Sequence, residues 1–139
     1  MSMDPVVHFE MAAGDSQRMA AFYAKIFGWQ TKVMGEDMGG YVVVTTTEND
    51  PATGRPKQPG AINGGFYDKK RSKFPPVPSI VIAVDDVQAK MKMIEAEGCK
   101  ILTGPDVIPG IGTYVSFEDT EGNRVSLLQP SSDMTQAKQ

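Results

Sequence analysis

The sequence predicts an α+β fold made of two copies of one βαβββ unit, which form a curved mixed sheet around a groove. First, the same order of elements, a strand, a helix and three strands, is found twice along the chain. Second, the helix-starting Asp15 recurs as Asp86, 71 positions later, and the helix-ending Gly28 recurs as Gly98, 70 positions later. Third, strands follow each helix as a group instead of alternating with helices, which favours α+β over α/β.

The first copy begins with a strand over residues 6–11, whose apolar side chains alternate with a second face that carries His8 and Glu10. A helix follows from Gly14-Asp15-Ser16 to Gly28. The apolar stripe of this helix consists of Met19, Phe22, Tyr23, Ile26 and Phe27. We expect a polar loop over 48–59 and strands over 29–34, 41–47 and 60–67, the last weakened by Gly64 and Gly65.

The second copy follows a connection over residues 68–78, which we expect to be exposed because it holds four positive charges and three prolines. We expect a strand over 79–84, a helix from Asp85-Asp86 to Gly98, and strands over 99–102, 113–118 and 123–129. The sequence thus predicts one domain over 1–139, with the first repeat over about 5–67, a linker over about 68–77, the second repeat over about 78–130 and a polar tail over 131–139.

Composition narrows the classes of function. The 14 Lys and Arg against 17 Asp and Glu give a net charge of −3, which argues against a nucleic-acid partner. The single Cys excludes an internal disulfide, and the single His excludes any metal site with two histidines from one chain. No apolar run reaches the ~20 residues of a membrane span, and the start shows no secretory pattern. We therefore expect a cytoplasmic protein without a membrane partner.

Three segments carry a resemblance to a known family. They are VVHFEMAAGDSQRMAAFYAKIFGWQ, SIVIAVDDVQAKMKMIEAEGCKI and FEDTEGNRVSLLQP. Together, over residues 6–130, they resemble the vicinal oxygen chelate superfamily, which includes lactoylglutathione lyase (glyoxalase), bleomycin-resistance proteins and extradiol dioxygenases. The resemblance implies the glyoxalase-like fold, a homodimer and a small-molecule ligand, but not one reaction, because this superfamily hosts many chemistries.

The resemblance also implies where metal ligands would lie in metal-dependent members. The histidine of the first strand falls on His8, the histidine of the fifth strand on Ser79, and the glutamate of the final strand on Ser126, while the fourth ligand falls near Asn63 or Gly64. Serine hydroxyls are poor ligands for a divalent ion, so we expect that the usual metal site is lost and that no cofactor is bound. Glu10 lies on the same strand face as His8, so a divalent metal stays the alternative.

His8 and Glu10 are the candidate catalytic residues. Imidazole gains and loses a proton near neutral pH, which suits a general base, and Glu10 would orient His8 or act as a base itself. The alternatives are a structural histidine and a solvated glutamate. The candidate substrate-binding residues are Tyr41, Asn63, Ser79, Arg124 and Ser126. Arg124 shares strand parity with Ser126, from where it could pair with a carboxylate or phosphate or simply lie exposed near a turn.

These residues lead to two main functional hypotheses. The first is a small-molecule enzyme of unassigned reaction, of lyase or isomerase type, that abstracts a proton next to a carbonyl through His8. True lactoylglutathione lyase activity is not expected, since a metal normally stabilises the enediolate in that reaction. The alternative is a non-catalytic ligand-binding protein of the bleomycin-resistance type, which would sequester an amphipathic molecule. A module that acts only through protein contacts is a third reading.

Overall fold

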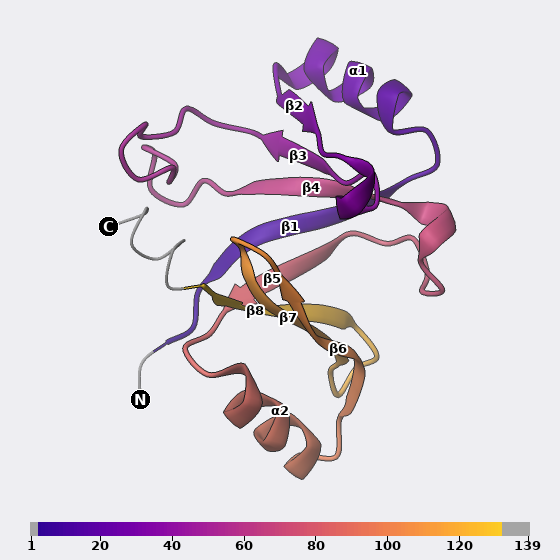
Figure 1. Cartoon of the computed structure of the whole chain (residues 1–139), viewed down its shortest axis with the longest axis vertical. Coiled ribbons are helices and arrows are strands. Elements are labelled where there is room, and N and C mark those ends of the chain that lie inside the picture. Colours follow the sequence, from indigo (N-terminus) through magenta and orange to yellow (C-terminus); the bar gives the residue numbers. More distant parts are fainter. Residues whose placement is uncertain (1–2, 132–139) are drawn as a thin grey trace. The chain divides into compact units, whose positions relative to one another are not determined.

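The computed structural model describes residues 3–131, and over this range the βαβββ order occurs twice (Figure 1). The predicted α+β fold with two such repeats is therefore confirmed. Two short 3-10 helices, η1 (Glu36–Met38) and η2 (Lys69–Arg71), lie in the connections. The chain divides into an N-terminal unit (residues 8–51 and 55–78) and a C-terminal unit (residues 3–7, 52–54 and 79–131). From residue 132 on, the predicted polar tail lies outside the described residues.

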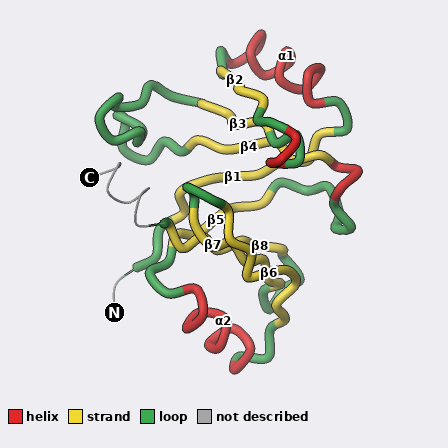
Figure 2. The backbone as a smooth tube through the Cα atoms, in the orientation of Figure 1, coloured by secondary structure: helices red, strands yellow, loops and turns green. Residues whose placement is uncertain are grey.

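The N-terminal unit contains four strands and one α-helix, besides η1 and η2. Figure 2 distinguishes strands, helices and loops by colour. The elements of this unit are β1 (Val6–Ala13), α1 (Ser16–Phe27), β2 (Gln30–Val33), β3 (Val42–Thr45) and β4 (Asn63–Asp68). The strand order is β2-β3-β4-β1, where β1 and β4 run parallel and the other neighbours antiparallel. Strand β4 therefore lies between β3 and β1.

The C-terminal unit repeats this arrangement. Its elements are β5 (Ser79–Ala83), α2 (Val87–Ala96), β6 (Lys100–Ile108), β7 (Gly112–Glu118) and β8 (Arg124–Pro130). The strand order is β5-β8-β7-β6, again with one parallel pair, β5 and β8. The start of the chain belongs to this unit, because the Pro5 carbonyl accepts a hydrogen bond from the Ala83 N–H at 2.9 Å and Asp4 forms an ion pair with Lys90 at 3.0 Å.

Both helices begin at the aspartates that the sequence predicts. The Asp15 carboxylate accepts a hydrogen bond from the Arg18 N–H at 3.0 Å, and the Asp86 carboxylate accepts one from the Ala89 N–H at 3.0 Å. Helix α1 ends at Gly28, whose φ of 74° is a left-handed conformation that glycine adopts readily. Neither helix within residues 3–131 combines the length and the apolar character that crossing a membrane requires.

Each helix covers one face of its own sheet. In the N-terminal unit Met19 and Tyr23 of α1 pack on a core formed by Ala13, Val42, Val44 and Phe66. In the C-terminal unit α2 packs on a core formed by Val84, Val87, Val115 and Leu127. The opposite face of each sheet is therefore free of its helix, and the polar side chains of the strands gather there.

Two expectations need correction. The predicted apolar stripe of α1 is buried only in part: Phe22, Ile26 and Phe27 are 55%, 56% and 60% exposed, because only one side of the helix faces the sheet. Strand β6 was expected to end at residue 102 but continues to Ile108. Its pairing with β7 shifts register twice, between residues 101 and 106, and these irregularities carry the strand through Gly104-Pro105.

Candidate functional site

His8 and Glu10 lie on the face of the N-terminal sheet that α1 leaves uncovered. Side chains alternate along β1, so the face opposite the partly buried Phe9 and the buried Ala13 carries His8 and Glu10. Strand β4 pairs with β1 in register, and Asn63 stands beside His8 and Gly65 beside Glu10. His8 is half-buried and Glu10 is only 9% exposed. A carboxylate this deeply buried needs polar partners.

Tyr41 links these two side chains. Its hydroxyl lies 2.9 Å from His8 Nε2 and donates a hydrogen bond to Glu10 Oε2 at 3.1 Å. Tyr41 immediately precedes β3 and is separated from His8 by 33 positions in the sequence. The structure thus brings together three of the predicted site residues as one hydrogen-bonded chain, His8–Tyr41–Glu10.

Gly65 makes this contact sterically possible. Strands β3 and β1 both flank β4, so they are about 10 Å apart at the usual strand spacing. The Tyr41 side chain has to cross β4 to reach β1, and it does so over Gly65: a Cβ at this position would overlap the Tyr41 ring and hydroxyl. Gly65, which the sequence presented only as a weak strand residue, is therefore part of the site.

Asn63, predicted to bind substrate, uses its amide to hold the chain around it. Its Oδ1 accepts a hydrogen bond from the Thr46 N–H at 2.9 Å, and its Nδ2 donates one to Asn49 Oδ1 at 3.0 Å. These contacts tie β4 to the end of β3 and to the start of the polar 48–59 loop. Both the oxygen and the nitrogen of this amide therefore have hydrogen-bond partners within the protein, which is typical of a structural role.

The remaining predicted residues lie on the helix-free face of the C-terminal sheet. Ser126 is fully buried and its hydroxyl lies 2.6 Å from that of Tyr114. Ser79 is 6% exposed, and its Oγ has no hydrogen-bond partner among the described residues. Arg124 shares the strand face of Ser126 and stands opposite Glu118 on β7. Tyr114 was missed from the sequence, because its hydroxyl meets Ser126 only diagonally across the paired strands: the register sets Tyr114 opposite Leu128 and Ser126 opposite Ser116.

The two sheets can be compared through their registers. Glu10 pairs with Gly65 in the N-terminal unit, and Val81, its counterpart in the second repeat, pairs with Ser126. Gly65 is thus the counterpart of Ser126; it lies one position after Gly64 and two after Asn63, the positions near which the fourth ligand was expected. Glycine offers no side-chain donor to a metal ion.

The donor set of this face does not fit the divalent ion of metal-dependent relatives. Within residues 3–131, no three His, Cys, Asp or Glu side chains are grouped so that they could hold a metal ion. His8 and Glu10 supply one imidazole and one carboxylate, and both bond to Tyr41. Such an imidazole–phenol–carboxylate chain can hold and move protons without a metal.

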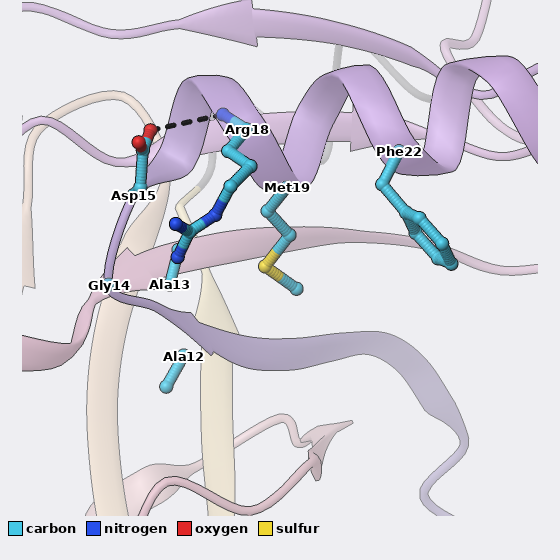
Figure 3. A pocket seen from close by; sticks show the side chains of 7 residues that line it. All are labelled: Ala12, Ala13, Gly14, Asp15, Arg18, Met19 and Phe22. Atoms are coloured by element: carbon cyan, nitrogen blue, oxygen red, sulfur yellow. Dashed lines mark hydrogen bonds between the residues drawn. The ribbon is translucent and has the colours of Figure 1, made fainter.

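Two open hollows lie near the N-terminal sheet. One, of about 210 Å³, is lined by Met38, Gly39, Tyr41, Tyr67, Asp68, Arg71 and Ser72, so it adjoins the site at Tyr41. The other, of about 390 Å³, lies at the connection between β1 and α1. It is lined by Ala12, Ala13, Gly14, Asp15, Arg18, Met19 and Phe22 (Figure 3). None of the predicted site residues lines the second hollow. Its Asp15 is already engaged as the helix cap.

Comparison with known proteins connects this fold to a family. A sequence model of the Glyoxalase/Bleomycin resistance protein/Dioxygenase superfamily matches residues 6–127. The anthracycline biosynthesis protein DnrV of Streptomyces peucetius is 26% identical over 125 residues, an alignment that covers 82% of this chain and 42% of that protein. The chain therefore spans less than half the length of this relative.

Solved structures share the fold. A methylmalonyl-CoA epimerase variant of Streptomyces coelicolor, in complex with 2-nitronate-propionyl-CoA, has a TM-score of 0.67 and 17% identity, covering 94% of this chain and 100% of its own. The methylmalonyl-CoA epimerase of Mycobacterium tuberculosis has a TM-score of 0.65 and 13% identity, with 98% and 96% covered. Identities this low show the fold alone. The family model matches most of this chain, and the chain therefore belongs to the Glyoxalase/Bleomycin resistance protein/Dioxygenase superfamily.

Proposed function

We propose that this protein is a small-molecule enzyme that abstracts a proton next to a carbonyl, with His8 as the base and Glu10 as its supporting carboxylate. The observation that carries the proposal is the hydrogen-bonded chain from His8 Nε2 through the Tyr41 hydroxyl to Glu10 Oε2. A histidine coupled to a nearly buried carboxylate is the arrangement expected of a general base, since the negative charge stabilises the protonated imidazole.

The proposed step is an isomerase- or lyase-type proton transfer. The C–H bond beside the carbonyl breaks, its proton forms an N–H bond on His8, and its electron pair moves onto the carbonyl oxygen as an enolate. Return of the proton to carbon completes an isomerisation. From their residue types alone, we propose separately that Arg124, Ser79 and Ser126 of the C-terminal unit serve ligand binding in that unit.

We also propose that this step uses no metal ion. The support is the chemistry of the donor set, in which serine and glycine stand at three of the four family ligand positions. Stabilisation of the enolate would then come from hydrogen-bond donors of the protein. Metal analysis of protein purified without a chelator tests this part, and one bound divalent ion per chain would overturn it.

Solvent deuterium exchange tests the reaction class. The probes are methylmalonyl-CoA, the substrate of the epimerases that share the fold, and the hemithioacetal of methylglyoxal with glutathione. In D₂O, ¹H NMR should show protein-dependent loss of the carbon-bound proton from at least one probe, with or without EDTA. His8→Gln should slow this exchange on the order of 10²-fold or more, because it removes the base.

Matched variants separate the site from general effects. Glu10→Gln should slow the exchange, whereas Glu48→Gln, a change of the same type at an exposed ion pair with Lys57, should not. Unchanged exchange in His8→Gln would contradict the proposal. So would the absence of exchange from both probes in a protein whose melting temperature they raise, a result that supports the ligand-binding alternative.

The assembly and location of the protein are further proposals, based on the family resemblance and the sequence. We propose a homodimer that works in the cytoplasm. Sedimentation velocity of the purified chain, across a range of concentrations, tests the first proposal, and a monomer throughout would contradict it. Fractionation of the source cells tests the second.

A further inference from the structure

The hydrogen bonds of Tyr41 have a consequence for the proton on His8. A phenol has one proton, and Tyr41 donates it to Glu10 Oε2, since a carboxylate can only accept. The Tyr41 oxygen must then accept its other bond, the 2.9 Å contact with His8 Nε2. His8 Nε2 therefore carries a hydrogen, and the lone pair of the neutral ring lies on Nδ1.

We propose that Tyr41 is a positioning residue, which holds His8 in the Nε2–H tautomer and leaves Nδ1 as the basic atom. The same hydroxyl conveys the negative charge of Glu10 to the imidazole. That Nδ1 acts as the base rests on the proposed function. The tautomer itself rests only on the hydrogen bonds.

Gly65 is the second part of this arrangement. Glu10 belongs to β1 and Tyr41 precedes β3, and these two strands flank β4 within the sheet. The Tyr41 ring reaches Glu10 only because position 65 on β4 has no side chain. If Tyr41 served only as packing, its hydroxyl could be lost without effect on the proton of His8. If it positions His8, removing the hydroxyl and blocking its path should have the same effect on that proton.

The single histidine allows a direct test by NMR that requires no substrate. In the full-length protein labelled with ¹⁵N-histidine, at a pH where the ring is neutral, we expect one ring N–H cross-peak. Its nitrogen should be Nε2, which couples to both ring carbon-bound protons. Tyr41→Phe should abolish this cross-peak, because Nε2–H then loses its acceptor and exchanges with water. Tyr23→Phe, the same change in the core beside Trp29, should retain it.

A second pair of variants tests the same inference without changing Tyr41. Gly65→Ala should abolish the cross-peak, while Gly14→Ala should retain it, because a Cβ on Gly14 meets no atom within 4 Å. Tyr41→Phe preserves the ring, so it provides the decisive comparison where Gly65→Ala does not fold.

Three results would overturn the inference: a hydrogen on Nδ1 in the wild type, no observable ring N–H, or a cross-peak that survives in Tyr41→Phe. Where a probe is turned over, Tyr41→Phe should also lower kcat on the order of tenfold or more with little change in KM. If both probes raise the melting temperature without reacting but the tautomer behaves as expected, the proposed function fails and the inference about Tyr41 stands.

Discussion

Gly64 and Gly65 are neighbours on β4 that admit aromatic rings on opposite faces of the sheet. A Cβ on Gly64 would overlap the ring of Phe9, which packs against the core, and a Cβ on Gly65 would overlap Tyr41. Glycine weakens a strand through its backbone entropy. At these two positions that loss is offset, because each glycine lets a large side chain pack closely over the backbone.

Gly64→Ala should therefore lower the free energy of unfolding by about 1–3 kcal/mol, the usual effect of adding a methyl group to a filled core. Urea denaturation measures the change. Gly14→Ala is the control, since its Cβ would stand in open space. Equal midpoints for the two variants would show that the core accommodates the methyl group and that the predicted clash is wrong.

Asn63 offers a test between binding and structure at a single residue. Asn63→Ala leaves the partly buried N–H of Thr46 without its acceptor, so it should reduce stability by about 1–3 kcal/mol and speed hydrogen exchange at Thr46. Hydrogen exchange and urea denaturation measure both effects. Unchanged stability together with weaker binding of a probe would instead support the substrate-binding role predicted from the sequence.

At the scale of elements, both helices use the same N-terminal device. Asp15→Ala and Asp86→Ala should each lower stability by about 0.5–2 kcal/mol, because each removes a side-chain acceptor from a helix N–H. Asp85→Ala, one position before the second cap, is the control and should have a smaller effect. Thermal unfolding followed by circular dichroism compares them, and an equal loss in all three would argue against capping.

The turn between β7 and β8 depends on one carboxylate. Asp119 accepts hydrogen bonds from the side chain of Asn123 and from the N–H groups of Asn123 and Glu121, at 2.9–3.0 Å. These bonds favour the charged form and lower the pKa of Asp119, with the Asn123 side chain as the largest cause. The stabilisation is present above the pKa of the unfolded state and is lost as pH falls through the lower folded pKa.

Asp119→Asn should therefore be less stable than the wild type at neutral pH, and this difference should vanish once the pH falls below the folded pKa of Asp119. Urea denaturation at a series of pH values measures it. Glu121→Gln in the same turn controls for the loss of one negative charge. A stability difference independent of pH would mean that the Asp119 charge does not stabilise the turn.

At the scale of the whole molecule, the described residues contain two hydrophobic cores, one in each βαβββ unit. Phe66, 1% exposed, is a large buried side chain of the first, and Val115, fully buried, is central to the second. Each core is formed by a helix and the sheet of the same unit. A substitution that damages one core is therefore expected to reduce protection against hydrogen exchange mainly in the unit that contains this core.

Phe66→Ala should cost about 3–5 kcal/mol and should raise hydrogen exchange first in β3 and β4, whereas Val115→Ala should raise it first in β7 and β8. Native-state hydrogen exchange with peptide-level resolution measures the pattern. If both variants accelerated exchange uniformly along the chain, the two cores would form a single cooperative unit.

Local sequence patterns were sufficient to predict the repeat, the order of the elements and the helix caps at Asp15 and Asp86. Strand alternation also placed His8 and Glu10 on one face, and the motifs indicated the superfamily. The sequence did not predict the partial exposure of the apolar stripe of α1 or the length of β6. They depend on which side of the helix meets the sheet and on how β6 pairs with β7, and neither is encoded in local periodicity.

The site was decided by the tertiary structure. No sequence pattern places the Tyr41 hydroxyl between His8 and Glu10, because these residues are 33 and 31 positions away from it. The order β3-β4-β1 and the register that sets Gly65 beside Glu10 bring them together. Residue types along one strand are a local property of the chain, whereas contact across an intervening strand exists only once the sheet has formed.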